Sequence, residues 1–417
     1  MNISKRVLNM PFSGTRKLTP YINKAKANGK KIIAMYVGQP DIKTPDAFFK
    51  AIRNFNSDVL AYGENNGNPE LRLAMSNYYK RCDIDFEPSD IFVTVAGSEA
   101  ILFSLMITCD PGDNILAVEP FYTDYNLVTH ELSIDVKPIT TYPENGYHLP
   151  SKEKIQSLID EKTKAILMNH PNNPTGAVYS EQEVNMICDL AIENDLFIIS
   201  DEVYREFVYD NLQYTSFAHI ERAKNNVIIV DSVSKRFSAC GARIGNIASK
   251  NKEFLENIGK LCQARICAPT IDQEGAIELY KSSNEYIKKV NKEYQHRRDV
   301  AYDLLQEIEG IVCQKPEGAF YISAKLPVDN AEKFLIWMLE NFDDNGEVPM
   351  MSPINGFYKS EGLGTKEVRF AYVLKEERIV RAINILKQAL KAYPANEKNV
   401  TEWRTFLSES DILKQHK

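Results

Sequence analysis

The sequence lacks the features that mark several whole classes of protein. No apolar run approaches the ~20 residues that a membrane-spanning helix needs, and the first residues, MNISKRVLNMPFSG, have no apolar core of the kind found in signal peptides. The seven cysteines are scattered, odd in number and without CxxC pairs or nearby histidines, which indicates neither a disulfide framework nor a metal site. We therefore expect an unsecreted protein of the reducing cytoplasm, with no membrane partner.

The sequence also has no excess of basic residues. Lys and Arg total 50 against 57 Asp and Glu, a net charge of −7, so there is no electrostatic footprint for a nucleic-acid partner. Internal repeats and low-complexity tracts are missing as well. With 417 residues, of which 44% are hydrophobic, the chain is long enough for a large folded core and a companion domain.

Short, β-rich apolar runs recur between residues 90 and 249. They alternate with segments of helical or loop character, such as SEQEVNMICDLAIEND. This rhythm predicts an α/β fold with a mostly parallel, doubly wound sheet. The predicted strands are IFVTVA from Ile91, NILAVEP from Asn114, KAILMNH from Lys164, LFIIS from Leu196, NVIIV from Asn226 and GNIAS from Gly245.

A second α+β unit is predicted after this region. Residues 282–308 have the pattern of a long charged amphipathic helix, and EGAFYISA from Glu317 predicts a strand that opens the unit. It extends to about Pro394. The remaining residues, 395–417, are polar with a weak apolar period and form either a short docked helix or a tail.

The first polar segment at a predicted strand end is a candidate anion site. Open parallel sheets bind ligands beyond the carboxyl ends of their strands. Gly97, Ser98 and Glu99 follow IFVTVA at the start of a helix, where unpaired backbone amides form a seat for phosphate. An ordinary helix cap explains the same tripeptide, because serine is strongly preferred at caps.

Polar side chains also follow two later strands. Asp201 and Tyr204 follow LFIIS, and Ser232, Lys235 and Arg243 follow NVIIV. A lysine held in a desolvated site has a lowered pKa, which makes its neutral amine available for Schiff-base chemistry. A lone lysine is usually a solvated loop residue, but the carboxylate, the phenol, the arginine and an NNPTG turn at the same predicted edge favour a reactive site.

Taken in order, the motifs resemble those of the class I, fold type I aminotransferases that depend on pyridoxal 5'-phosphate, near the aspartate aminotransferases. The resemblance covers nearly the whole chain, and the order and spacing of the motifs make it specific. The motifs are SGTRKLTPYINKAKANGKKIIAMYVGQPDIKTP, YGENNGNPELRLAM, VAGSEAI, EPFYTDY, NHPNNPTGAVY, SDEVYREF, SVSKRFSACGARIG and FYKSEGLGTKEVRFAYVLKEE.

This resemblance implies a two-domain architecture. A large domain, residues 45–285, carries the mostly parallel sheet and binds the cofactor. A smaller α+β domain is built from residues 1–44 and 286–394. Residues 395–417 are expected to follow it as a tail or short helix.

The resemblance assigns cofactor roles to four residues. Lys235 matches the residue that forms a Schiff base with the cofactor and later moves a proton between the substrate α-carbon and the cofactor. Asp201 matches the partner that keeps the pyridine nitrogen protonated. Tyr204 and Asn173 match the groups that hydrogen-bond the phenolic oxygen, although Asn173 is also a plausible turn residue.

The resemblance also assigns residues to the phosphate and the ring of the cofactor. The phosphate seat combines the backbone amides of Gly97, Ser98 and Glu99 with the hydroxyls of Ser98 and Ser232 and the guanidinium of Arg243. A further residue, Tyr122, matches the aromatic position that stacks on the ring, where many relatives carry Trp. A core aromatic at a strand end is the alternative for Tyr122.

For the substrate, the resemblance points to Arg369, with Gly38 and Asn173. Arg369 matches the arginine that takes the α-carboxylate as a bidentate pair; flanked by Val368 and Phe370, it otherwise reads as a solvated strand residue. The resemblance does not assign the pocket for the substrate side chain. Arg265 is a candidate for a distal carboxylate, but an interface ion pair explains it equally well.

The activity implied is that of a transaminase of amino-acid metabolism, with glutamate and 2-oxoglutarate as one pair and a ping-pong mechanism. Tyr62 matches a tyrosine that reaches the cofactor phosphate of a neighbouring subunit, which implies a homodimer with shared active sites; a loop tyrosine packed within its own subunit is the alternative. A lyase or synthase of the same fold, and a non-catalytic sensor that keeps the cofactor, are the competing functions.

Overall fold

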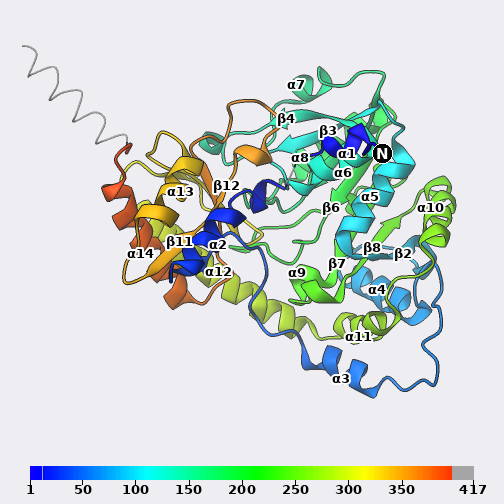
Figure 1. Cartoon of the computed structure of the whole chain (residues 1–417). Helices are drawn as coiled ribbons and strands as arrows, with labels where there is room; N and C mark the ends of the chain where they lie inside the picture. The colour runs from blue at the N-terminus through cyan, green and yellow to red at the C-terminus, as the bar shows by residue number, and fades with distance from the viewer. Residues whose placement is uncertain (12, 397–417) are drawn as a thin grey trace, which may run out of the picture.

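Strands and helices alternate through the central part of the chain (Figure 1). The computed structural model describes residues 1–11 and 13–396. Its helices are α1 (Lys5–Leu8), α2 (Thr19–Ala27), α3 (Asp46–Asn54), α4 (Pro69–Arg81), α5 (Ala96–Thr108), α6 (Asp124–Leu132), α7 (Lys152–Gln156), α8 (Glu181–Glu193), α9 (Val233–Arg236), α10 (Lys252–Arg265), α11 (Thr270–Tyr280), α12 (Asn284–Gln306), α13 (Ala331–Asn341) and α14 (Glu376–Ala392). Its strands are β1 (Lys31–Ala34), β2 (Ile91–Val95), β3 (Asn114–Glu119), β4 (Asp135–Thr140), β5 (Thr163–Asn169), β6 (Phe197–Asp201), β7 (Val227–Ser232), β8 (Ile244–Ser249), β9 (Val312–Cys313), β10 (Tyr321–Lys325), β11 (Glu347–Met350), β12 (Ser352–Pro353) and β13 (Glu367–Ala371).

The largest sheet has seven strands in the order β2-β8-β7-β6-β5-β3-β4. All neighbouring pairs are parallel except those that involve β8, which runs antiparallel to both β2 and β7. The six strands predicted from the sequence are all present, and the α/β fold class is confirmed. The edge strand β4 is an addition that the sequence pattern did not indicate.

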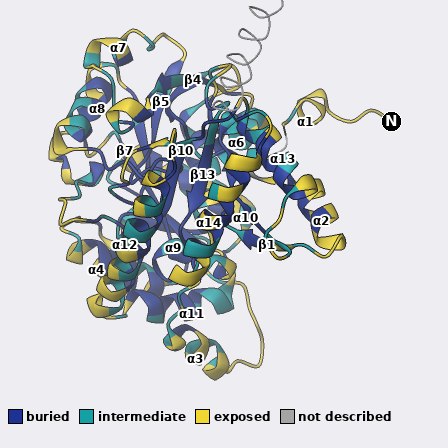
Figure 2. Ribbon diagram, turned by 90° about the vertical axis from the view of Figure 1, so that its left-hand side faces the viewer, coloured by how far each residue is buried: buried dark blue, intermediate teal, exposed yellow. Residues whose placement is uncertain are grey.

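Both faces of this sheet are covered, which explains the continuous apolar runs. In β7, Val227 and Ile229 pack into the cluster formed with α4, α8 and α11. The intervening Ile228 and Val230 pack on the other face, in the cluster formed with α5, α6 and α10. Figure 2 shows the strands as a buried layer and the outer helices with exposed surfaces.

A second group of elements lies beside the sheet and joins the two ends of the chain. Strand β1 pairs with β11 in parallel, and β12-β13-β10-β9 form an antiparallel sheet. Helices α2, α12, α13 and α14 contribute to its hydrophobic cluster (Figure 1). The predicted strand and long helix of this region are present, while the proposed domain boundaries stay a prediction.

The direction of β8 decides which residues meet at one edge of the large sheet. The carboxyl ends of β5, β6 and β7 lie together because these strands are parallel. Strand β8 is antiparallel to β7, so Gly245, near its start, lies opposite Ser232 at the end of β7. The segment that precedes β8 therefore joins the segments that follow β6 and β7.

Two further findings concern the described residues only. Within residues 1–11 and 13–396, no helix combines the length and the apolar composition needed to cross a membrane. In the same residues no group of His, Cys, Asp and Glu side chains is arranged to hold a metal ion. The predicted C-terminal tail or short helix, residues 395–417, lies outside the described residues except for Ala395 and Asn396.

Candidate active site

A cavity of about 520 Å³ opens at this edge, between the large sheet and strands β10 and β13. Most of the residues predicted for the site lie in its walls. They are Gly38, Gly97, Ser98, Tyr122, Asn173, Asp201, Tyr204, Ser232, Lys235, Arg243 and Arg369. Residues from the beginning, middle and end of the sequence therefore meet in one place.

Lys235 lies on α9, the short helix that follows β7 directly. Its Nζ atom reaches across the cavity and donates a hydrogen bond of 2.8 Å to the carbonyl oxygen of Gly38. The side chain is half-buried and the helix is only one turn long, because β7 ends at Ser232 and the chain must turn over the sheet edge. An amine in this position is available to a ligand in the cavity.

Asp201 is the last residue of β6 and is almost fully buried. The hydroxyl of Tyr125 donates to its Oδ2 atom at 2.6 Å, and the amide of Val203 donates to Oδ1 at 3.3 Å. Burial raises the pKa of Asp201 to about 6, because the ionised carboxylate loses its hydration. A cationic ligand beside this carboxyl would restore its ionised form.

Arg369 is buried on β13, with its guanidinium group in the cavity. Nη1 donates to Oδ1 of Asn173 at 2.9 Å and Nη2 donates to the carbonyl of Tyr36 at 2.8 Å. Nε is buried and has no hydrogen-bond partner among the residues that the structure describes. The fold thus answers the question left by the sequence, since Arg369 faces the cavity while Val368 and Phe370 pack in the core.

Tyr321, which the sequence analysis did not identify, joins these residues. Its ring lies 4.5 Å from the guanidinium carbon of Arg369, and its hydroxyl is 2.9 Å from that of Tyr204. A Cβ atom at Gly38 would lie 1.9 Å from the same hydroxyl. Glycine is therefore required at position 38 for Tyr321 to occupy this wall of the cavity.

The other end of the cavity offers donors for an anion. Gly97 and Ser98 lie in the first turn of α5, where backbone amides have no partner within the helix. Ser232 caps α9 by accepting from the amide of Ser234 at 3.3 Å. Arg243 has a left-handed backbone (φ 53°) immediately before β8 and is exposed toward the cavity.

Three residues singled out from the sequence do not line the cavity of their own chain. Glu99 accepts from the amide of Val95 at 2.8 Å, so its side chain caps α5. Tyr62 is 82% exposed between α3 and α4. Arg265 donates to the carbonyls of Asn65 and Val93, and its Nη1 atom lies 3.7 Å from the Glu99 carboxylate.

Tyr122 lines the cavity at the start of the segment that leads into α6. Its hydroxyl donates to Oδ2 of Asp124 at 2.6 Å, and its ring packs edge-on against that of Tyr125. Besides Tyr125 and Tyr321, the cavity walls include Asp124 and Arg16, which the sequence analysis also missed. The EPFYTDY motif contains two of these four residues, and its closely spaced polar and aromatic side chains after a strand were the available signal.

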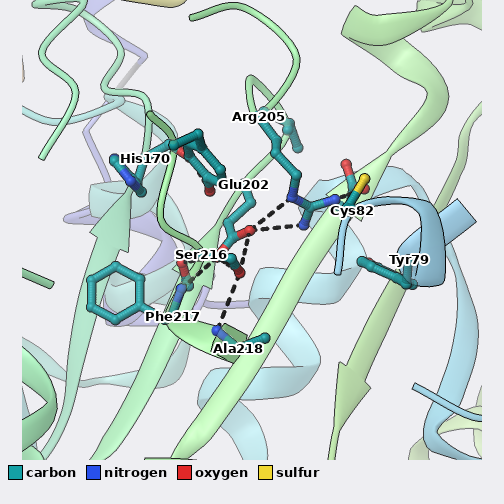
Figure 3. A network of polar contacts seen from close by, with 12 residues as sticks. Tyr79, Cys82, His170, Glu202, Arg205, Ser216, Phe217 and Ala218 are labelled. Carbon is teal, nitrogen blue, oxygen red and sulfur yellow. Dashed lines mark hydrogen bonds and ion pairs between the residues drawn. The ribbon is translucent and has the colours of Figure 1, made fainter. Parts of the chain in front are cut away.

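A buried network of polar contacts surrounds Glu202, which follows Asp201 directly in the sequence (Figure 3). Glu202 is fully buried and accepts from Arg205 at 2.8 Å and from the Ser216 hydroxyl at 2.8 Å. Burial alone would raise the pKa of Glu202, but the charge of Arg205 holds it below its ordinary value. Arg205 also pairs with Asp231, which accepts from Arg236 at 2.8 Å. The network therefore anchors the helix that carries the cavity lysine.

A sequence model of the family described as Aminotransferase class I and II matches residues 30–386. The chain belongs to this family. The aminotransferase is 32% identical over 398 residues to the probable aspartate/prephenate aminotransferase of Aquifex aeolicus, covering 93% of this chain and 98% of that protein. It is 29% identical over 404 residues to an aspartate aminotransferase of Bacillus subtilis, covering 94% and 100%.

Solved structures of aminotransferases share the fold. The alanine aminotransferase of Pyrococcus furiosus matches with a TM-score of 0.85 and 29% identity, over 94% of this chain and 100% of that one. The aspartate aminotransferase of Thermus thermophilus with maleate matches with a TM-score of 0.84 and 26% identity, over 93% and 100%. The protein is thus a fold type I, pyridoxal-phosphate-dependent aminotransferase of the aspartate aminotransferase type.

The cavity fits this cofactor. One end has helix amides, serine hydroxyls and an arginine, which suit a phosphate. The buried carboxyl of Asp201, whose pKa burial raises, suits a protonated ring nitrogen. The amine of Lys235 lies in the same cavity and suits an aldehyde.

Proposed function

We propose that this enzyme transfers an amino group between an L-amino acid and a 2-oxo acid by a ping-pong mechanism, with glutamate and 2-oxoglutarate as one pair. The observation that carries the proposal is the convergence of Lys235, Asp201 and Arg369 on one cavity. The names of the similar proteins, aspartate and alanine aminotransferases, support small L-amino acids as the partners.

Asp201 is proposed to hold the ring end of the cofactor. When bound, the cofactor supplies an electron sink for the substrate α-carbon. Asp201 then keeps a proton on the ring nitrogen, because a buried carboxylate is stabilised by an adjacent cation. Tyr125 supports this carboxylate with its hydrogen bond to Oδ2. Tyr122 is proposed to stack on the ring, held by its bond to Asp124.

The remaining cofactor contacts follow from the same walls of the cavity. Asn173 and Tyr204 are proposed to bind the phenolic oxygen, and the 3.5 Å separation of their polar atoms lets both reach one acceptor. The phosphate is assigned to the amides of the first turn of α5, to the side chain at the end of β7 and to the side chain that precedes β8. These residues are Gly97, Ser98, Glu99, Ser232 and Arg243.

Arg369 is proposed to bind the α-carboxylate that every amino acid and 2-oxo acid carries. Its buried Nε carries an N–H group without a hydrogen-bond partner among the described residues, so this group can donate to a ligand. Its hydrogen bonds to Asn173 and Tyr36 fix the plane of the guanidinium group. Lys235 is proposed to form the covalent link to the cofactor and to move the proton at the α-carbon. Its hydrogen bond to Gly38 supports this role because it directs the amine into the cavity.

A homodimer with shared active sites is part of the proposal. Tyr62 is 82% exposed and lies on a segment with two other exposed apolar side chains, Val59 and Leu60. Exposed apolar side chains grouped on one segment favour burial against another chain. A second copy of the protein would then receive Tyr62 at its phosphate site.

The proposal is tested by adding single amino acids, without any oxo acid, to the cofactor-loaded enzyme. A donor should convert the cofactor stoichiometrically to its aminated form and release its own oxo acid, and 2-oxoglutarate should then restore the starting spectrum. Initial rates should give parallel double-reciprocal lines. Net release of ammonia or of a cyclised product, with no aminated cofactor, would identify a lyase or synthase instead, and no reaction with any donor would identify a sensor.

A further inference from the structure

The segment that connects β12 to β13, residues 354–366, is a compact loop that we call the strap. Its two ends are joined, because the amide of Ile354 donates to the carbonyl of Glu367 at 3.1 Å. Three of its side chains, Ile354, Phe357 and Tyr358, are buried and form a hydrophobic cluster of their own. A loop with joined ends and its own packed side chains behaves as a unit, and loops of this kind frequently serve a function.

The strap contacts the site through Phe357. The guanidinium carbon of Arg369 lies 5.2 Å from the centre of the Phe357 ring, which is within the range of a cation–π contact. The carbonyl oxygen of Phe357 accepts from the amide of Phe121 at 2.9 Å. Because Phe121 directly precedes Tyr122, one strap residue joins the arginine proposed for the α-carboxylate to the segment that carries the ring proposed to stack on the cofactor.

Glu119, the last residue of β3, anchors the tip of the strap, residues 359 and 360. Its side chain is fully buried. Its Oε2 atom accepts from the backbone amides of Lys359 at 2.7 Å and Ser360 at 3.0 Å, and Oε1 accepts from the Ser360 hydroxyl at 2.5 Å. The hydroxyl of Thr140, on β4, also donates to Oε1 at 2.7 Å. Hydrogen bonds to an ionised group are about twice as strong as neutral ones, so this carboxylate holds the tip firmly.

A second link between the strap and the large sheet is exposed. The Nζ atom of Lys359 lies 3.0 Å from Oδ1 of Asp135 on β4, but the two side chains are 45% and 69% exposed. Water and salt screen such a pair, so it contributes little. The buried carboxylate of Glu119 is therefore the contact that fixes the tip of the strap.

We propose that Glu119 is a positioning residue that acts through the strap. By fixing the tip of the strap at the end of β3, its carboxylate holds the Phe357 ring beside Arg369 and so sets the orientation of that guanidinium group. Glu119 lies outside the walls of the cavity, so it contacts neither substrate nor cofactor itself. The inference rests on the proposed function, because the role of Arg369 does. It adds the anchor that joins the large sheet to the sheet that contains β13.

Glu119→Met tests the anchor in the cofactor-free protein, because methionine has a similar size and cannot accept from the two amides of the strap. Lys359 is exposed, so trypsin can report on the tip. Trypsin should cut the variant after Lys359 about tenfold faster than the parent, because the released tip opens more often. Mass spectrometry identifies the cleavage site. Cleavage at the parental rate would show that Glu119 does not hold the strap.

A binding measurement separates positioning from a purely structural role. Propionate, an unreactive monocarboxylate, is titrated into the cofactor-loaded enzyme, and its dissociation constant is read from the cofactor spectrum. Glu119→Met should weaken propionate about threefold to tenfold, and it should have no effect in the Arg369→Gln background, because the effect passes through that guanidinium. Equal weakening in both backgrounds, or a loss of stability with unchanged propionate binding, would overturn the proposal.

Glu119→Gln is the conservative variant and should behave nearly like the parent. Its amide oxygen can accept from the two strap amides, while its NH₂ group donates to the hydroxyls of Ser360 and Thr140. Asp135→Asn is the matched control, because it breaks only the exposed link, and it should match the parent in both assays.

Ser360→Ala covers the case in which Glu119→Met does not fold. It removes one hydroxyl donor from the strap and leaves the large sheet unchanged, so it should give the same two changes in smaller size. Parental cleavage and parental propionate binding in this variant would also contradict the proposal. Failure of the parent enzyme to transaminate any donor would overturn the proposed function, whereas the trypsin result on the cofactor-free protein tests the anchor separately.

Discussion

Lys235 is the residue proposed to form the covalent link to the cofactor, and its removal gives a direct prediction. Lys235→Ala should abolish transamination while the fold stays intact, because a half-buried side chain at a cavity contributes little packing. Borohydride should fix the cofactor covalently to the parent and not to the variant, as measured by mass spectrometry. Transamination at the parental rate by the variant would show that another group is the nucleophile.

Asp201 gives a pH-dependent prediction for the cofactor-free protein. Its folded pKa of about 6 lies above the unfolded value of about 3.9, so the native state binds more protons between these pH values. The contribution of Asp201 to the free energy of unfolding should therefore fall by roughly 2 kcal/mol as pH rises from 4 to 7. Urea unfolding of the parent and of Asp201→Asn, measured across this pH range, should show this difference. If the free energies of unfolding of the two proteins change in parallel with pH, the prediction is wrong.

Among individual residues, the sequence predicted those site residues that directly follow a predicted strand. It did not predict the residues that reach the cavity only through the packing of distant elements. Lys235 and Asp201 stand directly after apolar runs, so the sheet topology placed them at one edge. Tyr321 and Arg16 come from a strand and a turn of the other group of elements. Their contacts with the cavity depend on how those elements pack against the sheet, which periodicity does not encode.

Among the elements, α9 depends on buried charge for its position. Arg236 is fully buried on this helix and donates to Asp231 of β7, with its guanidinium carbon 4.2 Å from the centre of the Tyr78 ring. Arg236→Met should lower the free energy of unfolding by about 3 to 5 kcal/mol, because Asp231 loses a buried partner. It should also broaden the pH titration of the cofactor absorbance, since Lys235 lies on the same turn.

Arg222→Met is the matched control for this prediction. Arg222 pairs with Asp189 at 2.6 Å, but both side chains are over 40% exposed. Water and salt screen such a pair, so the substitution should cost at most about 1 kcal/mol. Thermal unfolding of both variants measures the two losses in the free energy of unfolding. Equal losses would show that burial does not determine how much the ion pair of Arg236 contributes to stability.

The elements themselves were predictable where both sheet faces are covered. The central residues of β5, β6 and β7 are apolar, and this pattern indicates a buried parallel strand. The edge strand β4, DVKPIT, mixes polar residues with a proline and gives no such signal. The antiparallel direction of β8 also needed the structure, because apolar composition does not report strand direction.

For the whole molecule, the proposed shared-site dimer makes a prediction about mixed chains. Tyr62→Ala and Lys235→Ala damage opposite halves of each proposed site, so a mixed dimer contains one site with both native residues. Co-refolded variants should exceed the activity of either variant alone, provided that Tyr62→Ala is impaired. Gel filtration with activity assays measures this. An active monomer, or no recovery in mixed dimers, would return Tyr62 to a role within its own subunit.

The parallel pairing of β1 with β11 has a consequence for synthesis of the protein. Lys31 lies opposite Glu347, so a little over 300 residues separate the partners along the chain. At the usual speed of translation, β1 emerges roughly 15 to 60 seconds before its partner exists. During that time the apolar side chains of Ile33 and Met35, which are buried in the finished protein, remain available to chaperones. Ribosome-bound chains arrested before Glu347 should therefore retain chaperone at this segment and release it only when β11 has been made.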